Sequence, residues 1–173
     1  NEVAVPFQAK LHPNFIQPWY DGILIVSKSE KSVSSRAGHQ LMDEHPYREV
    51  RYQQAHDNLS DIINAMESGD IEQFGRIVEN EALSLHGLMM NSHPWFILMQ
   101  PETLQVVNRL RTWREQNKVP VYFTLDAGPN VHVLYPEQAR QQVEAYISEQ
   151  LVVYCEGKQW IPDRVGKGPV RIA

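Results

Sequence analysis

Short runs of β-branched residues alternate along the chain with longer stretches in which hydrophobic side chains recur every three or four positions. The first short run, residues 22–27, predicts a buried strand. Before it, Pro6, Pro13 and Pro18 interrupt small apolar pieces, and each proline removes a backbone donor. Residues 1–21 are therefore expected to form an extended lead-in rather than one regular element.

Two consecutive amphipathic helices are predicted next. Hydrophobic residues recur at helical spacing over 52–66, and Gly69 follows where a left-handed helix end is favoured. A second hydrophobic stripe runs over 71–89. Asp70 stands immediately before it as an N-cap, and Gln73 completes the pattern of a capping box.

A helix and a hairpin are predicted after residue 100. The helix is expected to begin near Pro101, because proline is favoured in the first helical turn. Two β-branched runs follow, at 119–125 and 131–135. The residues between them, 126–130, include glycine, proline and asparagine, so we expect a turn that pairs the runs as a hairpin.

The remaining elements decide the fold class. A fourth helix is expected over 139–147, a short strand over 151–155, and a further strand at the end of the tail 160–172. Helices and strands are mixed without regular βαβ alternation. The chain is therefore expected to adopt an α+β fold, with helices packed on one face of a mostly antiparallel sheet.

Composition and charge exclude several classes of protein. The 173 residues are 42% hydrophobic, which is enough for the core of one domain. The net charge of −5 comes from 21 acidic and 16 basic residues with interspersed signs, which argues against sequence-independent nucleic-acid binding. Cys155 is the only cysteine and so excludes an internal disulfide. No apolar run approaches the ~20 residues that span a bilayer, and no signal peptide is visible. We therefore expect a cytoplasmic protein that does not enter the membrane.

The first candidate site is a polar segment at 31–38, where serines precede the expected start of a helix. Free backbone N–H groups and the helix dipole favour a phosphate there. Ser34 and Ser35 could donate hydrogen bonds, while Lys31 and Arg36 could supply positive charge. The alternative is that one of the serines only caps the helix.

The second candidate is Asp126, which follows an apolar strand and precedes the rigid Ala-Gly-Pro-Asn turn. A carboxylate held still at the rim of a sheet can accept or orient the proton of a hydroxyl during phosphoryl transfer. The alternative is an aspartate that only hydrogen-bonds the turn backbone.

Other familiar chemistries lack a matching pattern. None of the seven histidines has the spacing of a metal-ligand pair, so no metal site is expected. The sequence contains no phosphate-binding Gly-x-x-x-x-Gly-Lys-Ser/Thr loop and no nucleophile elbow. His86 lies at the edge of its helical stripe, where it either faces a cleft or completes a packed surface. We favour packing for His86.

Together the two candidate segments resemble the diphosphomevalonate decarboxylase family of the GHMP kinase superfamily. In that family one strand leads to a Lys-x-Val-Ser-Ser or Lys-Val-Pro-Ser loop, and a later strand ends in Phe-Thr-Met/Phe-Asp-Ala-Gly-Pro-Asn. Here 31–36 read Lys-Ser-Val-Ser-Ser-Arg, and 123–130 read Phe-Thr-Leu-Asp-Ala-Gly-Pro-Asn. Segments 85–87, 92–94 and 165–169 are similar to three further family motifs, so the resemblance covers nearly the whole chain.

The resemblance implies a reaction and the residues that carry it. The complete family enzyme uses ATP and Mg²⁺ to phosphorylate the tertiary hydroxyl of mevalonate 5-diphosphate. It then loses phosphate and CO₂ to give isopentenyl diphosphate. Asp126 would be the base or orienting carboxylate for that hydroxyl. Ser35 would help to hold the substrate, with Ser34, Arg36 and Lys31 as further candidates.

The resemblance also implies a division into domains. Residues 22–173 would form the GHMP-type C-terminal domain, and 1–21 would lead in from an N-terminal domain of the same polypeptide that binds most of the ATP and Mg²⁺. His39, Gly87 and Trp95 depart from the family pattern, which usually has Met, Ala and Pro there.

Two alternative functions stay open. One is a related GHMP enzyme that acts on a mevalonate monophosphate, or that phosphorylates mevalonate without decarboxylation. The other is a non-catalytic α+β module that binds an anion. The oligomeric state is also open, a homodimer included.

Overall fold

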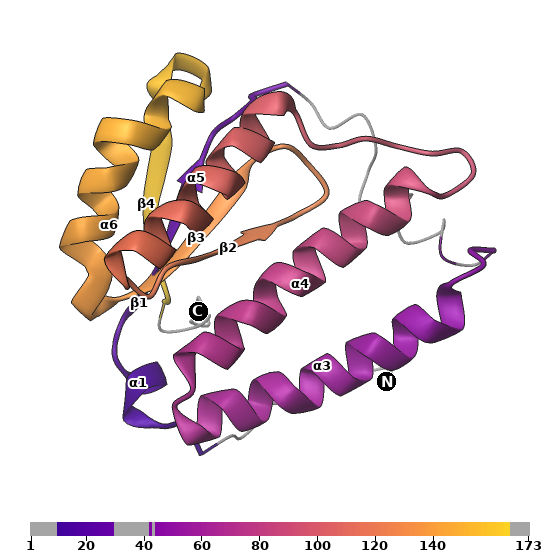
Figure 1. The fold of residues 1–173 in the computed structure, drawn as a ribbon, viewed down its shortest axis with the longest axis horizontal. Helices are drawn as coiled ribbons and strands as arrows, with labels where there is room; N and C mark the ends of the chain where they lie inside the picture. The colour runs from indigo at the N-terminus through magenta and orange to yellow at the C-terminus, as the bar shows by residue number, and fades with distance from the viewer. Residues whose placement is uncertain (1–9, 30–41, 43, 167–173) are drawn as a thin grey trace, which may run out of the picture.

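The computed structural model describes residues 10–29, 42 and 44–166. The described residues begin with a one-turn helix, α1, and a strand, β1. Three long helices, a hairpin, a shorter helix and a last strand follow (Figure 1). The main elements are α1 (Pro13–Ile16), β1 (Trp19–Leu24), α3 (Arg48–Ser68), α4 (Ile71–Met90), α5 (Pro101–Asn117), β2 (Tyr122–Leu125), β3 (Val131–Pro136), α6 (Arg140–Tyr146) and β4 (Trp160–Arg164).

The four strands form one antiparallel sheet in the order β2-β3-β1-β4. The hairpin expected around 126–130 is therefore confirmed, and β1 lies in the same sheet. Leu24 at the end of β1 and Leu125 at the end of β2 both pair with Val131. The carboxyl ends of β1 and β2 thus meet at one edge of the sheet, on either side of β3.

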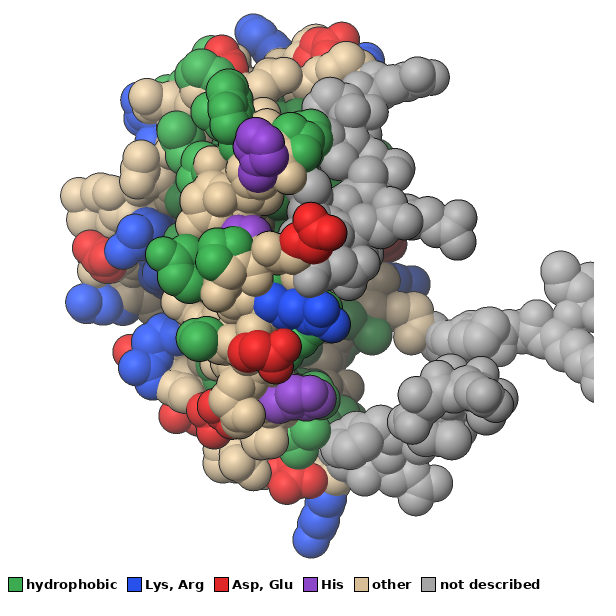
Figure 2. Space-filling model, turned by 90° about the vertical axis from the view of Figure 1, so that its right-hand side faces the viewer, with side chains coloured by type: hydrophobic (Ala, Val, Ile, Leu, Met, Phe, Trp, Pro, Cys, Tyr) green, Lys and Arg blue, Asp and Glu red, His purple; other side chains and the backbone are tan. Residues whose placement is uncertain are grey.

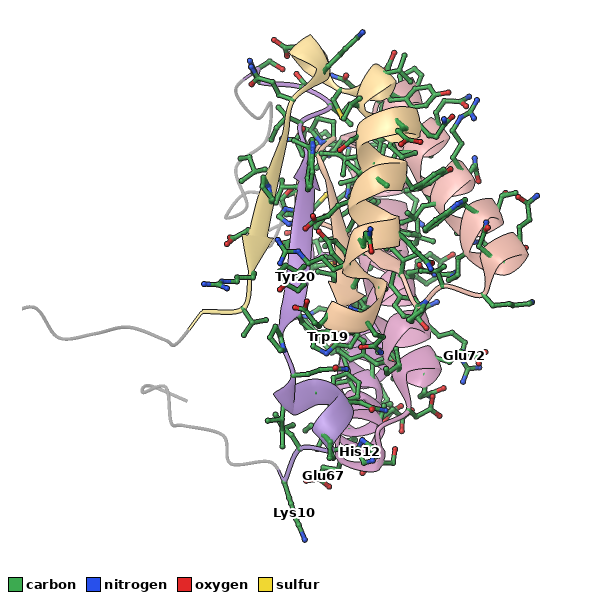
Figure 3. The ribbon with its side chains drawn as sticks, turned by 90° about the vertical axis from the view of Figure 1, so that its left-hand side faces the viewer. Lys10, His12, Trp19, Tyr20, Glu67 and Glu72 are labelled. Carbon is green, nitrogen blue, oxygen red and sulfur yellow. The ribbon has the colours of Figure 1, made fainter. Side chains whose placement is uncertain are left out.

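One face of the sheet carries the core. Alternate strand residues such as Tyr20, Leu24 and Val133 are buried against α5, α6 and the turns after α6. Figure 3 shows the helices gathered on one side of the sheet. The α+β fold with helices on one face is therefore confirmed. The order of elements, with three long helices between β1 and β2 and with α6 between β3 and β4, corresponds to a β-α-β-β-α-β arrangement in which the first helical layer is enlarged.

Helix α4 runs along β2, and α3 packs outside α4 (Figure 1). A glycine at position 75 allows the close approach, because a Cβ there would lie 2.0 Å from the ring of Tyr122. The two elements are also joined by Glu79 of α4, which pairs with Arg114 of α5 at 2.5 and 3.1 Å and accepts a hydrogen bond from the amide of Phe123 at 3.3 Å. This ion pair fixes α4 and α5 to the same strand.

The ends of α3 and α4 match the sequence pattern with one exception. Gly69 adopts a left-handed conformation with φ of 83°, and Asp70 accepts a hydrogen bond from the amide of Gln73 at 2.8 Å. The reciprocal half of the capping box does not form. The amide of Asp70 instead donates to Ala65 O at 2.9 Å, because the closing turn of α3 uses it.

The expectation of an extended lead-in is wrong for residues 13–16, which form α1. Pro13 occupies the first turn, and His12 caps the helix by accepting from the amide of Asn14 at 3.2 Å. The amide of His12 also donates to Met66 O, and Figure 3 shows His12 beside Glu67. β1 then begins at Trp19, earlier than expected.

The strand expected over 151–155 is also wrong. Residues Ile147–Leu151 form a wide helical turn after α6, and Val152–Tyr154 form a 3₁₀ turn. Ala139, Val143, Ile147 and Leu151 recur at steps of four, and all are buried in the core. That burial continues the helical face, while both edges of β1 are taken by β3 and β4. β4 lies at the start of the 160–172 tail, and the end of the tail, where a strand was expected, lies outside the described residues.

The surface near the carboxyl end of α4 mixes charges of both signs with hydrophobic side chains (Figure 2). No area of one sign dominates the part of that face that the structure describes. Among the helices of the described residues, none is long and apolar enough to cross a bilayer.

Candidate active site

Asp126 lies directly after β2, at the sheet edge where β1 and β2 both end. Its side chain is exposed, although Leu125 before it and Ala127 after it are buried. The amide of Gly128 donates to the carbonyl of Asp126 at 2.7 Å and closes a tight three-residue turn. The carboxylate therefore projects from a backbone that is fixed on both sides.

The turn is anchored to two helices. His86 of α4 contacts the carbonyl oxygen of Asp126 through Nε2 at 2.9 Å. Thr103, in the first turn of α5, donates from Oγ1 to the carbonyl of Pro129 at 2.6 Å. Ala127 packs against Met89 in a small hydrophobic cluster at the end of α4. The turn is thus held through hydrogen bonds and through apolar contact.

A third anchor joins the turn to the segment that follows β1. Asn130 accepts a hydrogen bond at Oδ1 from the amide of Ser27 at 3.0 Å. Ser27 and Ser29 share a hydrogen bond at 2.6 Å between their hydroxyl oxygens. The residues directly after β1 therefore lie beside the Asp126 turn.

The described residues before α3 are joined to the end of α4. His45, which is buried, contacts Asn91 Oδ1 through Nε2 at 2.7 Å. Asn91 is the C-cap of α4 and follows Met89 by two residues. Lys31, Ser34, Ser35 and Arg36 lie outside the described residues, so their placement beside Asp126 stays a prediction.

His86 is the most deeply buried titratable side chain near the turn, with 1% of its surface exposed. Burial lowers the pKa of its imidazole, and its contact with Asp126 opposes that shift only in part. The ring is therefore neutral at pH 7. A carbonyl oxygen only accepts hydrogen bonds, so the proton is on Nε2 and points at Asp126. The preference for packing is confirmed by this burial, although the contact with the Asp126 carbonyl was not foreseen.

Other contacts around the turn were also missed. Thr103 was not singled out, and Asn130 was interpreted only as a turn former. The helix-start pattern carries one signal for Thr103, because a threonine three residues after Gln100 can close a cap, and the amide of Gln100 does donate to its Oγ1 at 3.1 Å. Nothing in the local sequence indicates the second hydrogen bond of Thr103, which it donates to the carbonyl of Pro129.

A cavity of about 610 Å³ lies at the opposite end of β2. Arg76, Arg114, Lys118 and Tyr122 line it together with Glu72 and Glu115. Because β2 separates this cavity from Asp126, it is a different surface from the candidate active site.

Comparison with known proteins places the chain in a family. The model of the mevalonate 5-diphosphate decarboxylase C-terminal domain matches residues 22–168. The chain belongs to this family. The matched range includes the sequence of the Asp126 turn, the polar segment 31–38 and the helices α3, α4 and α5, so the family resemblance found in the motifs is confirmed.

Individual family members differ in their substrates and in how much of them the chain covers. It is 28% identical over 116 residues to the phosphomevalonate decarboxylase of Haloferax volcanii, which is 67% of this chain and 36% of that protein. The mevalonate pyrophosphate decarboxylase of Streptococcus pyogenes shares the fold, with a TM-score of 0.78 and 23% identity over 96% of this chain and 48% of that one. MDDEF in complex with MVAPP, AMPPCP and magnesium has a TM-score of 0.74 and 27% identity, over 84% of this chain and 44% of that one. The chain thus spans less than half the length of these relatives.

Two departures from the family pattern lie near the site. Gly87 follows His86 in α4, and a Cβ added at Gly87 would meet no atom within 4 Å. An alanine, the usual family residue, would therefore fit. Trp95 lies in the connection between α4 and α5, directly after the cis His93–Pro94 peptide, and 65% of its surface is exposed.

Proposed function

We propose that the chain is the C-terminal half of an ATP-dependent decarboxylase that converts mevalonate 5-diphosphate to isopentenyl diphosphate, ADP, phosphate and CO₂. The observation that carries the proposal is an exposed Asp126 carboxylate on a turn held by α4, α5 and the end of β1. Membership of the decarboxylase family supplies the reaction.

Asp126 is proposed to act on the tertiary hydroxyl of the substrate. An ionised carboxylate accepts the hydroxyl proton or orients the hydroxyl while the phosphoryl group is transferred. Phosphoryl transfer depends mainly on positioning and charge stabilisation, and the anchored turn supplies positioning. Loss of phosphate and CO₂ from the phosphorylated substrate then yields the alkene.

The segment 31–36 is proposed to hold the substrate. Ser35 would donate a hydrogen bond to it, and Ser34, Arg36 and Lys31 would add hydrogen bonds and positive charge toward phosphate groups. Support comes from described residues on either side of the segment. Ser27, before it, donates to Asn130 of the Asp126 turn, and His45, after it, contacts Asn91 at the end of α4.

ATP and Mg²⁺ are proposed to bind mainly to an N-terminal domain of the same polypeptide, with residues 1–21 leading into 22–173. The lengths of the relatives support a further domain, and MDDEF has been seen with an ATP analogue and magnesium. ATP supplies the transferred phosphoryl group, and Mg²⁺ neutralises its charge. We also propose a cytoplasmic location, with a homodimer as a candidate assembly.

A second substrate has specific support. The relative from Haloferax volcanii is a phosphomevalonate decarboxylase, which removes CO₂ from a substrate with one phosphate fewer. The role of Asp126 would be the same, because the tertiary hydroxyl is common to both substrates. The difference would lie in how the phosphate end is held.

Product analysis separates these substrates. The natural polypeptide that contains this chain is incubated with ATP, Mg²⁺ and either mevalonate 5-diphosphate or mevalonate 5-phosphate. CO₂ and isopentenyl diphosphate from the first substrate support the main proposal, and CO₂ from the second alone supports the alternative. Phosphorylation without CO₂ release would refute both. The 173-residue chain by itself is expected to fold but to show no ATP-dependent turnover.

Two substitutions test the separate roles proposed for Asp126 and Ser35. Asp126→Asn keeps the size of the side chain but removes its proton-accepting power, so kcat should fall by about 10²–10⁴-fold. Ser35→Ala should mainly raise KM. Asp61→Asn, at an exposed position on α3, is the matched control and should leave both constants unchanged. Near-wild-type kcat in Asp126→Asn would leave Asp126 as a turn former only.

A further inference from the structure

The side chain of His86 reaches from α4 to the backbone of the residue that carries the proposed chemistry. The two residues are 40 positions apart in sequence, and Nε2 of His86 lies 2.9 Å from the carbonyl oxygen of Asp126. The imidazole is almost fully buried and contacts the peptide carbonyl of Asp126, a residue that is itself exposed. A side chain in this buried position can support Asp126 but is poorly placed to contact substrate.

The contact constrains one particular rotation. The carbonyl of Asp126 receives two donors, the His86 imidazole and the amide of Gly128 at 2.7 Å. Two donors occupy both lone pairs of the oxygen and fix the plane of the peptide between Asp126 and Ala127. On the other side, Leu125 is held in the sheet by its pairing with Val131. Both peptide planes that flank Asp126 are thus fixed, and with them the direction of its Cα–Cβ bond.

Packing around the contact keeps the imidazole in place. Met89 follows His86 by three residues, so both lie on the same face of α4. Met89 packs against Ala127, the residue next to Asp126. The hydrophobic contact and the hydrogen bond therefore hold consecutive residues of the turn against one helix.

We propose that His86 is a positioning residue for Asp126, and that its Nε2–H donation to the Asp126 carbonyl sets the carboxylate in reach of the substrate hydroxyl. This inference rests on the catalytic role proposed for Asp126. It assigns to His86 no contact with substrate and no proton transfer. The property that matters is a neutral donor at the place of Nε2.

The proposal predicts different kcat values for two substitutions of His86. His86→Leu fills a similar space without a donor, whereas the amide nitrogen of His86→Gln can donate from near the Nε2 position. In the natural polypeptide, His86→Leu should lower kcat by about 10- to 100-fold, the range that follows from misplacing a catalytic group by about 1 Å. KM for ATP and for the mevalonate substrate should change little. His86→Gln should restore kcat to within a few-fold of wild type.

Several outcomes would overturn the proposal. If His86→Leu lowers only the melting temperature and keeps kcat, the histidine is a packing residue. If His86→Gln is as impaired in kcat as His86→Leu, the donor is not what matters. Should His86→Leu fail to fold, His86→Asn is the second variant, because its shorter amide withdraws the donor while keeping a polar group. A wild-type kcat in folded His86→Asn would then reject the proposal.

A double-variant experiment separates this inference from the proposed function. If His86 acts through Asp126, adding His86→Leu to Asp126→Asn should reduce the residual kcat far less than it reduces the wild-type kcat. An equal reduction in both backgrounds rejects the positioning role. Asp126→Asn with wild-type kcat instead refutes the role of Asp126, whatever His86 does. A loss in Asp126→Asn with no loss in His86→Leu refutes only the inference.

Discussion

The close approach of α4 to β2 can be tested with two alanine substitutions in one helix. At Gly75 a Cβ would lie 2.0 Å from two ring carbons of Tyr122. The ring cannot easily move away, because it is buried and the guanidinium of Arg114 lies over it at 4.9 Å from the ring centroid. At Gly87 a Cβ would meet nothing within 4 Å.

The two substitutions should therefore change the free energy of unfolding in opposite directions. Alanine in place of a helical glycine stabilises by about 0.5–1 kcal/mol. Overpacking costs typically about 1–3 kcal/mol, and an overlap as severe as that at Gly75 belongs at the upper end. Gly75→Ala should thus destabilise by roughly 2 kcal/mol. Gly87→Ala should stabilise by about 0.5–1 kcal/mol, since only the helical preference changes.

Urea denaturation of the 173-residue chain measures both free energies of unfolding, and thermal melts give a second estimate. For a chain of this length about 1 kcal/mol corresponds to roughly 2–4 °C, so Gly75→Ala should melt about 4–8 °C lower. Gly75→Ala as stable as Gly87→Ala would refute the close packing of α4 on β2.

Further predictions concern three other side chains. Arg114→Met leaves the carboxylate of Glu79 without its partner and should lower the free energy of unfolding by about 3 kcal/mol, because Glu79 is largely buried. In urea denaturation, Glu79→Leu added to Arg114→Met should recover much of that loss. A double variant as unstable as Arg114→Met would contradict the pairing. Burial lowers the pKa of His86, so the unfolded chain binds a proton that the folded chain does not, and stability is lost as pH falls below about 6.5. His86→Gln should show a weaker fall in melting temperature between pH 7 and pH 5, and an unchanged profile would argue against a neutral buried imidazole. Burial raises the pKa of Cys155 to about 11, so iodoacetamide at pH 8 should label this thiol only after unfolding; rapid labelling of the folded chain would show that the thiol is accessible.

Local patterns were enough to predict the helices α3, α4, α5 and α6 and the hairpin. The stripe over 71–89, the cap at Asp70 and the left-handed Gly69 depend on residues within a few positions of one another. The turn after Asp126 is equally local, since glycine and proline define it wherever it occurs. For the same reason the motif around Asp126 could be matched to a family before any contact was known.

The strand expected over 151–155 shows where local patterns fail. Its β-branched residues are compatible with a strand, but the edges of β1 were already paired with β3 and β4. Leu151 instead extends the buried face of α6. Which segment takes an open sheet edge depends on the whole sheet, and a short apolar run does not contain that information.

The support of the candidate site was decided only by tertiary structure. The sequence alone identified Asp126 as a carboxylate on a stiff turn and placed His86 at the margin of a helical stripe. It did not indicate that the imidazole donates to the Asp126 carbonyl, or that Thr103 and Ser27 hold the same turn. The physical reason is that residue type and spacing set local conformation, whereas hydrogen bonds between residues 26 to 103 positions apart form only when packing brings their elements together.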